Sequence, residues 1–302
     1  SKLGFTQSNA HTDWEETVYE ASFPSNRAET WARTEADRFS RPVFRLFQSE
    51  LEAVFEEYNK EQDSADMAVF LKSLEETFKG HPYARTVLGL REHLKNPSLA
   101  KMYAFYDAWY RPDNMAIVLS GDFERETLLP LLERSFGALR ARAPSAPNPP
   151  PGQFDDARGA RRSEIFFPGE EAAVLAWKTP QDNHPDLDAL SILSHILIND
   201  RSGIIDRHLS QTQKIKKAQG ELLRLNEGGA FLLLVAPKAG QSLEDAEKLV
   251  LSEVDRIKAG DFSEQDLRTA ITYFEGNKKL NLESDKHRVG TMVDSYIKGR
   301  DW

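Results

Sequence analysis

The sequence predicts an α+β fold made of two domains, each an antiparallel-rich sheet covered by helices. Two observations lead to this prediction. Strand-like and helix-like segments form separate blocks in each half of the chain, unlike the strict alternation of parallel α/β folds. A proline-rich segment, residues 141–162, divides the 302 residues into halves of ordinary domain size. We therefore expect a first domain over residues 1–140 and a second over residues 163–302.

The predicted linker between the two domains reads ARAPSAPNPPPGQFDDARGARR. Its run from Pro149 to Pro151 cannot form an α-helix, and alanine, glycine and arginine fill much of the rest. A composition of this kind favours an extended, semi-rigid connection.

The first half shows one β-segment followed by several helices. Residues 7–24 alternate polar and apolar side chains, which predicts one long strand or a tight hairpin that ends at Pro24. Helical periodicity then runs from Glu29 to about Lys60, with an interruption at Pro42. The remaining elements are expected in this order: a helix over 64–78, a loop over 80–89, a helix over 98–108, a buried strand over 115–121 and a helix over 127–136.

The second half repeats this pattern. We expect a strand over 173–178, helices over 185–198 and 202–211, a strand and turn over 229–240, and a helix over 243–258. The strand–turn–helix patterns of residues 115–136 and 230–258 resemble two copies of one unit, which suggests a duplication.

Composition excludes several classes of protein. The net charge of −9 argues against a general nucleic-acid binder, and the short basic cluster of Lys214, Lys216 and Lys217 is expected to lie on a solvated helix face. The absence of cysteine excludes disulfides and thiolate sites. No apolar run reaches the length of a membrane span, so we expect a soluble protein. The chain opens at Ser1 directly on strand-like sequence, which suggests a fragment or a processed chain.

The helical segment SELEAVFEEYNKE, residues 49–61, carries five glutamates among apolar residues. Glu50 and Glu57 are seven positions apart, so both lie on nearly the same face of the helix. Spacing alone favours an ordinary solvated acidic face. The other interpretation is that the two carboxylates face a cation, because carboxylates beside an apolar stripe are costly to bury without a partner.

Five segments, in order, resemble the M16 metallopeptidases: pitrilysin, insulin-degrading enzyme and the mitochondrial processing peptidases. They are SNAHTDWEETVYEASFP, SELEAVFEEYN, GHPYARTVLGLREHL, FYDAWYRPDNMAIVLSGDF and LDALSILSHILINDRSGIIDRHL. Asp113 stands where the family's strand motif usually has asparagine. The resemblance covers almost the whole chain and implies two domains of the LuxS/MPP-like type.

The resemblance implies a zinc endopeptidase that cleaves extended peptides. The family holds zinc with two histidines of an H-x-x-E-H helix and a later glutamate, which maps to Glu57. Glu50 maps to a carboxylate that orients the zinc site from outside the ligand set. Asn9, Ala10 and Thr12 map to the edge strand on which a peptide substrate adds by main-chain hydrogen bonds.

The chain lacks H-x-x-E-H, and none of its seven histidines are paired at ligand spacing. The motif and its general base are therefore expected upstream of Ser1, and this chain alone is expected to be inactive and to hold no zinc. The alternative is a non-catalytic M16-like partner or structural subunit. Expected partners are a peptide or protein substrate and a second M16 half or subunit, without nucleic acid. The sequence does not fix the compartment, and the bacterial periplasm is the one that it favours.

Other residues receive simpler interpretations. His11 is expected near the peptide or as an incidental surface histidine, while His81 and Tyr83 are expected to shape a loop. His195, on an apolar helix face, is expected to be a satisfied core histidine.

Overall fold

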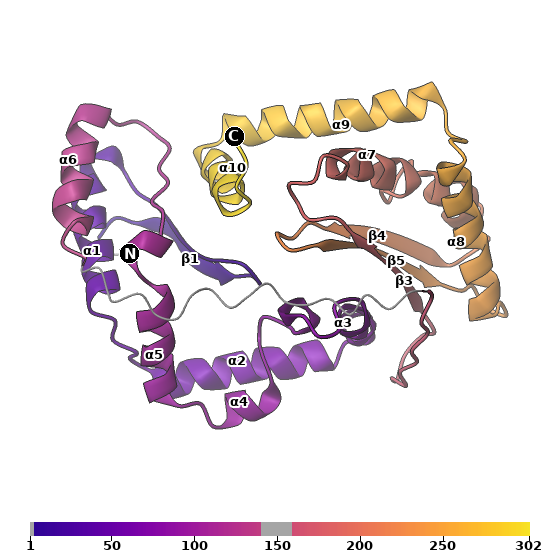
Figure 1. The fold of residues 1–302 in the computed structure, drawn as a ribbon, viewed down its shortest axis with the longest axis horizontal. Helices are drawn as coiled ribbons and strands as arrows, with labels where there is room; N and C mark the ends of the chain where they lie inside the picture. The colour runs from indigo at the N-terminus through magenta and orange to yellow at the C-terminus, as the bar shows by residue number, and fades with distance from the viewer. Residues whose placement is uncertain (1–2, 140–158) are drawn as a thin grey trace.

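The computed structural model describes residues 3–139 and 159–302 (Figure 1). The predicted linker falls largely in the gap, outside the described residues. The first half contains β1 (Thr6–Thr12), β2 (Thr17–Ser22), α1 (Ala28–Ser40), α2 (Phe47–Gln62), α3 (Ala65–Thr77), α4 (Arg91–Lys95), α5 (Leu99–Trp109) and α6 (Arg125–Phe136). The second half contains β3 (Ala173–Thr179), α7 (Leu187–Leu197), β4 (Lys217–Leu223), β5 (Gly229–Ala236), α8 (Leu243–Lys258), α9 (Glu264–Glu283) and α10 (Asp285–Ile297).

The first β-segment is a tight antiparallel hairpin. β1 pairs with β2, with Ala10 opposite Tyr19 and Thr12 opposite Thr17. The four-residue turn is closed by the Asp13 amide, which donates to the Glu16 carbonyl at 2.9 Å. The sequence was compatible with one long strand or with a hairpin, and the structure shows the hairpin.

The long helical segment after the hairpin is broken as predicted near Pro42. α1 ends at Ser40 and α2 begins at Phe47, and Leu46 just before it has a left-handed φ of 55°. Proline is unfavourable inside a helix because it lacks the amide hydrogen and its ring clashes with the preceding turn. The break turns α2 away from α1, so that α2 runs along the lower edge of the molecule in Figure 1.

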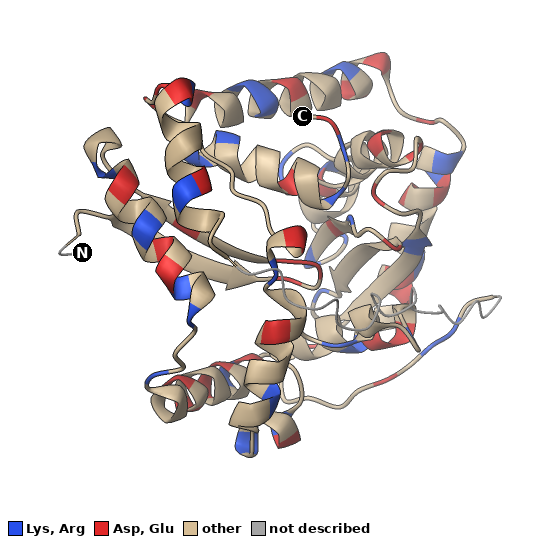
Figure 2. Ribbon diagram, turned by 60° about the vertical axis from the view of Figure 1, so that its left-hand side comes forward, with Lys and Arg blue, Asp and Glu red and all other residues tan. Residues whose placement is uncertain are grey.

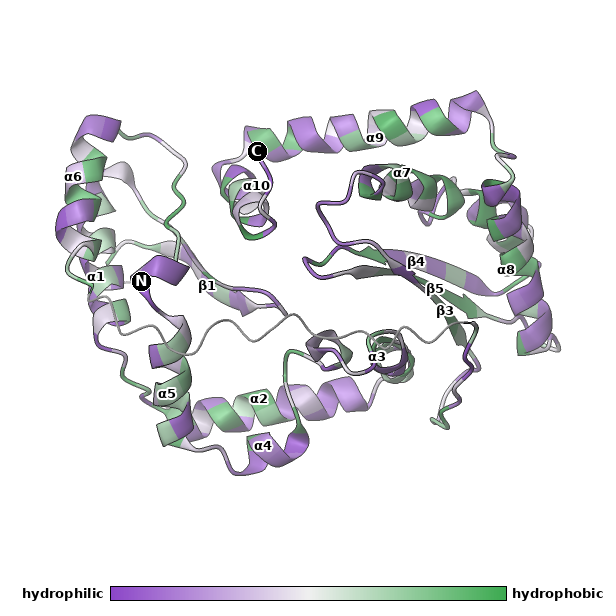
Figure 3. Ribbon diagram, viewed as in Figure 1, coloured by the Kyte–Doolittle hydropathy of each residue, from purple (hydrophilic) through white to green (hydrophobic). Residues whose placement is uncertain are grey.

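The second half is built on a three-stranded antiparallel sheet in the order β3–β5–β4. The central strand β5 is buried on both faces, which explains its unbroken apolar run (Figure 3). Alternate residues of a strand point to opposite faces. Leu233 and Val235 therefore enter one core with Ile205, Ala246 and Val250, beneath α7 and α8.

The opposite face of this sheet is covered by the first half. Ala230 and Leu232 of β5 pack in one core cluster with Leu74, Phe78 and Tyr83, which come from α3 and the turn that follows it. The two halves therefore share a hydrophobic core, and α3 lies against the sheet of the second half (Figure 1).

Residues 115–121 do not form the predicted strand. The segment lies extended without ladder pairing, and Ile117 is 42% exposed. A strand requires a neighbour for its backbone donors and acceptors, and no strand of residues 3–139 or 159–302 pairs with this segment. The first of the two predicted strand–turn–helix units, residues 115–136, therefore has its helix but lacks its strand.

The basic cluster is not a helix face as predicted. Lys217 begins strand β4, and its ammonium lies 3.9 Å from the Asp66 carboxylate of α3, while Lys216 pairs with Glu170. Figure 2 shows basic and acidic residues interspersed over the visible helices. Within the described ranges, no helix is long and apolar enough to cross a membrane.

The start of α9 is fixed by Asp266. Arg207 donates to its carboxylate at 2.7 Å, and the Ser263 hydroxyl and amide donate at 2.7 and 3.0 Å. The Arg207 hydrogen bond, followed by those from Ser263, lowers the pKa of Asp266 from 3.8 to about 2.

Asp266→Asn is expected to cost about 2 kcal/mol of unfolding free energy at neutral pH. The folded-state pKa lies below the unfolded value, so this stabilisation is present above about pH 4 and is lost as the pH falls toward about 2. Urea unfolding across this range should show the two proteins converging in acid. A constant difference at every pH would contradict the assignment, and Asp301→Asn, at the exposed C-terminal end, is the control.

Candidate functional site

Helix α2 places both predicted glutamates on its exposed surface. Glu50 lies in the first turn and Glu57 two turns later, and both side chains are exposed. The helix packs through Leu51, Val54 and Tyr58, which are half-buried. Within the described parts of the chain, neither carboxylate makes a hydrogen bond or ion pair to another side chain. The structure therefore leaves both groups available to a partner or to water.

A third carboxylate of α2 shares the face of Glu57. Glu61 lies four positions after Glu57 and is half-buried. Burial, followed by the negative charge of Glu57, raises the pKa of Glu61. Glu61 was not predicted as a site residue, although its i,i+4 spacing from Glu57 is visible in the sequence. Glu57 and Glu61 repel each other when both are ionised, and a cation beside them would relieve that repulsion.

The described residues do not fit a complete zinc site. No group of three histidine, aspartate or glutamate side chains that could hold a metal exists in residues 3–139 and 159–302. His11 lies on β1 beside Glu16 at 3.5 Å, and His81 bonds Glu227 at 2.7 Å. A catalytic zinc site needs three protein ligands. Any site that uses Glu57 therefore needs ligands from outside these residues.

Strand β1 carries the predicted peptide-binding residues. Asn9, Ala10 and Thr12 all lie on β1, and every residue of the strand is exposed. β1 pairs only with β2 in the described sheets, so its second edge presents main-chain donors and acceptors without a strand partner. An extended peptide could add to such an edge.

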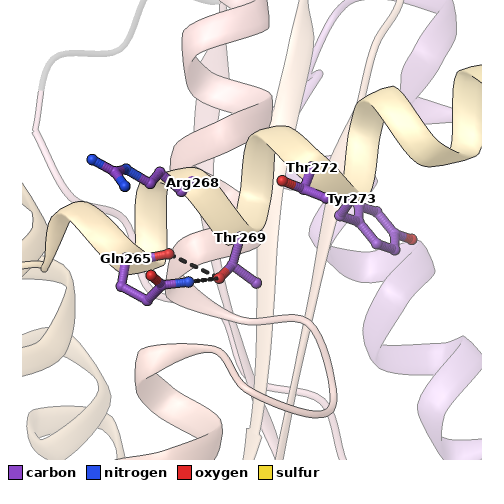
Figure 4. Close-up of a pocket in the computed structure, with 5 residues that line it drawn as sticks. All are labelled: Gln265, Arg268, Thr269, Thr272 and Tyr273. Carbon is purple, nitrogen blue, oxygen red and sulfur yellow. Dashed lines mark hydrogen bonds between the residues drawn. The ribbon is translucent and has the colours of Figure 1, made fainter.

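His195 is half-buried beside two exposed aromatic side chains, so it only partly fits the predicted core histidine. The His195 ring stacks on Tyr273 at 4.1 Å and meets the edge of Phe274 at 5.5 Å. Burial lowers the pKa of His195. Beside it, α9 lines an open hollow with Gln265, Arg268, Thr269, Thr272 and Tyr273 (Figure 4). Polar side chains there bond within the helix, since Gln265 donates to Thr269 at 3.2 Å, and the hollow shows no chemistry of its own.

The comparisons with known proteins agree on one family. A sequence profile described as "Peptidase M16 inactive domain" matches residues 97–274, more than half of the chain. The chain is 22% identical over 255 residues to zinc protease PqqE of Helicobacter pylori, covering 83% of this chain and 57% of that protein. It is 27% identical over 213 residues to the probable mitochondrial-processing peptidase subunit beta of Schizosaccharomyces pombe, covering 67% and 45%. The chain thus spans about half of the length of these relatives.

Solved structures show the same fold. A protease from Helicobacter pylori superposes with a TM-score of 0.90 at 21% identity, over 99% of this chain and 73% of that one. The periplasmic protease PqqL from Escherichia coli gives 0.71 at 15% identity, over 98% and 34%. A chain of complex III2 from Candida albicans gives 0.74 at 14% identity, over 98% and 73%. The fold is that of the M16-like peptidases.

The chain belongs to the peptidase M16 family, and the profile that it matches describes the family's inactive domain.

Proposed function

We propose that this chain is part of a zinc-dependent endopeptidase that cleaves extended peptides. The observation that carries the proposal is the exposed, unpaired carboxylate of Glu57 on α2, in a chain whose curated relatives are named zinc proteases. Glu57 supplies one zinc ligand, and the other ligands come from outside the described residues. Zinc bound in such a site would supply Lewis-acid activation of a peptide carbonyl and of water.

The residues of this chain bind and orient the substrate. A peptide adds to the free edge of β1 beside Asn9, Ala10 and Thr12, through main-chain hydrogen bonds that do not depend on its sequence. Glu50 lies one helical repeat before Glu57 and orients the zinc site without binding the metal. The chain alone, with one ligand, is inactive. A second M16 half or subunit completes the protein, and the periplasmic location of PqqL supports the same compartment here.

A non-catalytic partner or structural subunit is the second candidate. It is supported by the profile of the inactive domain and by the fold shared with a chain of complex III2. A subunit of that kind needs neither a peptide-binding edge nor Glu57. Peptide binding at β1 therefore separates the two candidates.

The test is amide hydrogen exchange of the chain with and without a short fluorescein-labelled peptide of alternating valine and lysine residues. We expect the peptide to slow exchange in Asn9–Thr12 severalfold, because new main-chain hydrogen bonds protect the amides of β1. The same peptide with N-methylated backbone amides is the control, since it keeps the side chains and loses the donors. Protection at β4, or equal binding of the methylated peptide, would contradict peptide addition to β1.

A further inference from the structure

The turn of the β1–β2 hairpin lies between the two halves of the molecule. The Glu15 carboxylate, at the tip of this turn, accepts a hydrogen bond from the Tyr83 hydroxyl of the first half. The same oxygen, Oε1, accepts a hydrogen bond from the main-chain amide of Asn226 at 2.7 Å. Asn226 lies in the turn between β4 and β5 of the second half. One carboxylate oxygen therefore joins the hairpin turn both to Tyr83 of its own half and to the β4–β5 turn of the second half.

The donors that Glu15 uses are themselves fixed. The Tyr83 hydroxyl accepts a hydrogen bond from the main-chain amide of Glu227 at 3.3 Å. Tyr83 is buried, with 5% of its surface exposed. The Tyr83 amide donates to Nδ1 of His81 at 3.2 Å. Nδ1 is thus an acceptor, so Nε2 carries the hydrogen that is donated to Glu227 at 2.7 Å. The β4–β5 turn is therefore held by hydrogen bonds to Tyr83 and His81 as well as to Glu15.

Trp14 is the second anchor of the hairpin. Its indole Nε1 donates to the Arg85 carbonyl at 2.7 Å. Its ring packs against the core shared by the halves, which contains Phe78 and Leu232. Trp14 anchors the turn by this apolar contact and one hydrogen bond, and Glu15 adds two further hydrogen bonds, which are directional.

The second half also contacts the hairpin through α10. The Asn226 side chain donates to the Ile297 carbonyl of α10 at 3.1 Å. At the other end of that helix, Lys286 lies 3.4 Å from Glu20 of β2. The turn at Asn226, the hairpin and α10 therefore form one connected set of contacts.

We propose that Glu15 is a positioning residue, which holds the peptide-binding strand β1 in a fixed orientation to the second half. The inference rests on the proposed function, since it assigns a role to Glu15 only if peptides bind on β1. The strand ends at Thr12, three residues before Glu15, so a displaced turn displaces the edge that the peptide would join. A peptide bound on β1 then meets the second half at a defined distance.

The test compares Glu15→Ala, Glu15→Gln, Tyr83→Phe and Glu16→Ala in the full chain. The readouts are amide exchange in residues 6–12 and 225–228, and the dissociation constant of the fluorescein-labelled valine–lysine peptide. Glu15→Ala should speed exchange in both segments and weaken peptide binding about tenfold, because it removes two hydrogen bonds to one carboxylate. Tyr83→Phe keeps the ring in the core and should give a smaller change in the same direction.

Two variants separate positioning from general destabilisation. Glu15→Gln retains a carbonyl oxygen that can accept both hydrogen bonds, so peptide affinity should return to within about threefold of the wild type. Glu16→Ala removes an adjacent carboxylate of the same turn, which contacts His11 and neither Tyr83 nor Asn226, and should leave exchange in residues 225–228 unchanged.

Three outcomes decide the matter. If the wild type binds the peptide and Glu15→Ala binds it with equal affinity, the inference is overturned and the proposed function stands. Faster exchange throughout β3 and β5 in Glu15→Ala would show plain destabilisation, and would also overturn it. Absence of peptide binding to the wild type would overturn the proposed function and this role of Glu15 with it.

Discussion

Under the proposed function, Glu57→Gln is expected to abolish zinc binding and peptide cleavage in the complete peptidase. The substitution replaces an anionic oxygen ligand with a neutral amide at an exposed position of α2. Carboxylate oxygen binds zinc closely, and losing one of three protein ligands leaves too few for a stable site. Zinc content by elemental analysis and the rate of peptide cleavage are the two measurements.

Two neighbouring glutamates are the controls. Glu50→Gln leaves the ligands in place, so zinc should still bind in excess metal, with roughly a 10- to 100-fold loss of affinity or activity. Glu56 lies about 100° from Glu57 around the helix, so Glu56→Gln should be nearly neutral. If Glu56→Gln lost zinc and Glu57→Gln retained it, the ligand would be Glu56, one residue before the position assigned to it. No effect in any of the three would refute the role of α2.

The elements that were predicted correctly are those whose signals are local. The polar–apolar alternation of residues 7–24 reflects a hairpin with exposed faces. The end of α1 at Ser40 follows from Pro42, which is unfavourable inside a helix for covalent reasons alone. The apolar run of β5 was recognised because both faces of that strand are covered.

The strand over 115–121 was predicted wrongly because strand formation is not a local property. Its apolar run is as continuous as that of β5, yet β5 has a partner on each side and residues 115–121 have none in the described parts of the chain. Strand β4 was missed for the converse reason. Its sequence, KAQGELL, has weak alternation, and pairing with β5 imposes the strand.

The residues of the candidate site likewise fall into those that local motifs predicted and those that only the fold brings together. Glu57, Glu50 and the residues of β1 could be named from a resemblance between short motifs, and they lie on the helix and strand expected of them. Glu15 could not be found, because its partners Tyr83 and Asn226 are 68 and 211 positions away in the sequence. No spacing rule links residues so distant, and only packing of α3 on the second sheet brings them together.

Asp182→Asn is expected to cost about 3 kcal/mol of unfolding free energy, because it leaves arginines near a buried position without their counter-charge. The Asp182 side chain is fully buried. Arg224 donates to one carboxylate oxygen at 2.6 Å. Nε of Arg300 lies 3.1 Å from the other, an ion pair without the alignment of a hydrogen bond. The expected loss is at the low end for a buried pair, since both arginines reach solvent.

Asp188→Asn is the matched control for this prediction. Asp188 pairs with the same Arg224 at 3.2 Å, but its side chain is 86% exposed. Exposed pairs contribute little because water screens them, so this variant should unfold almost as the wild type does. Urea unfolding of the three proteins decides the point. Equal losses in both variants would show that burial of Asp182 does not set the strength of its pairs, and that Arg224 is held equally by both carboxylates.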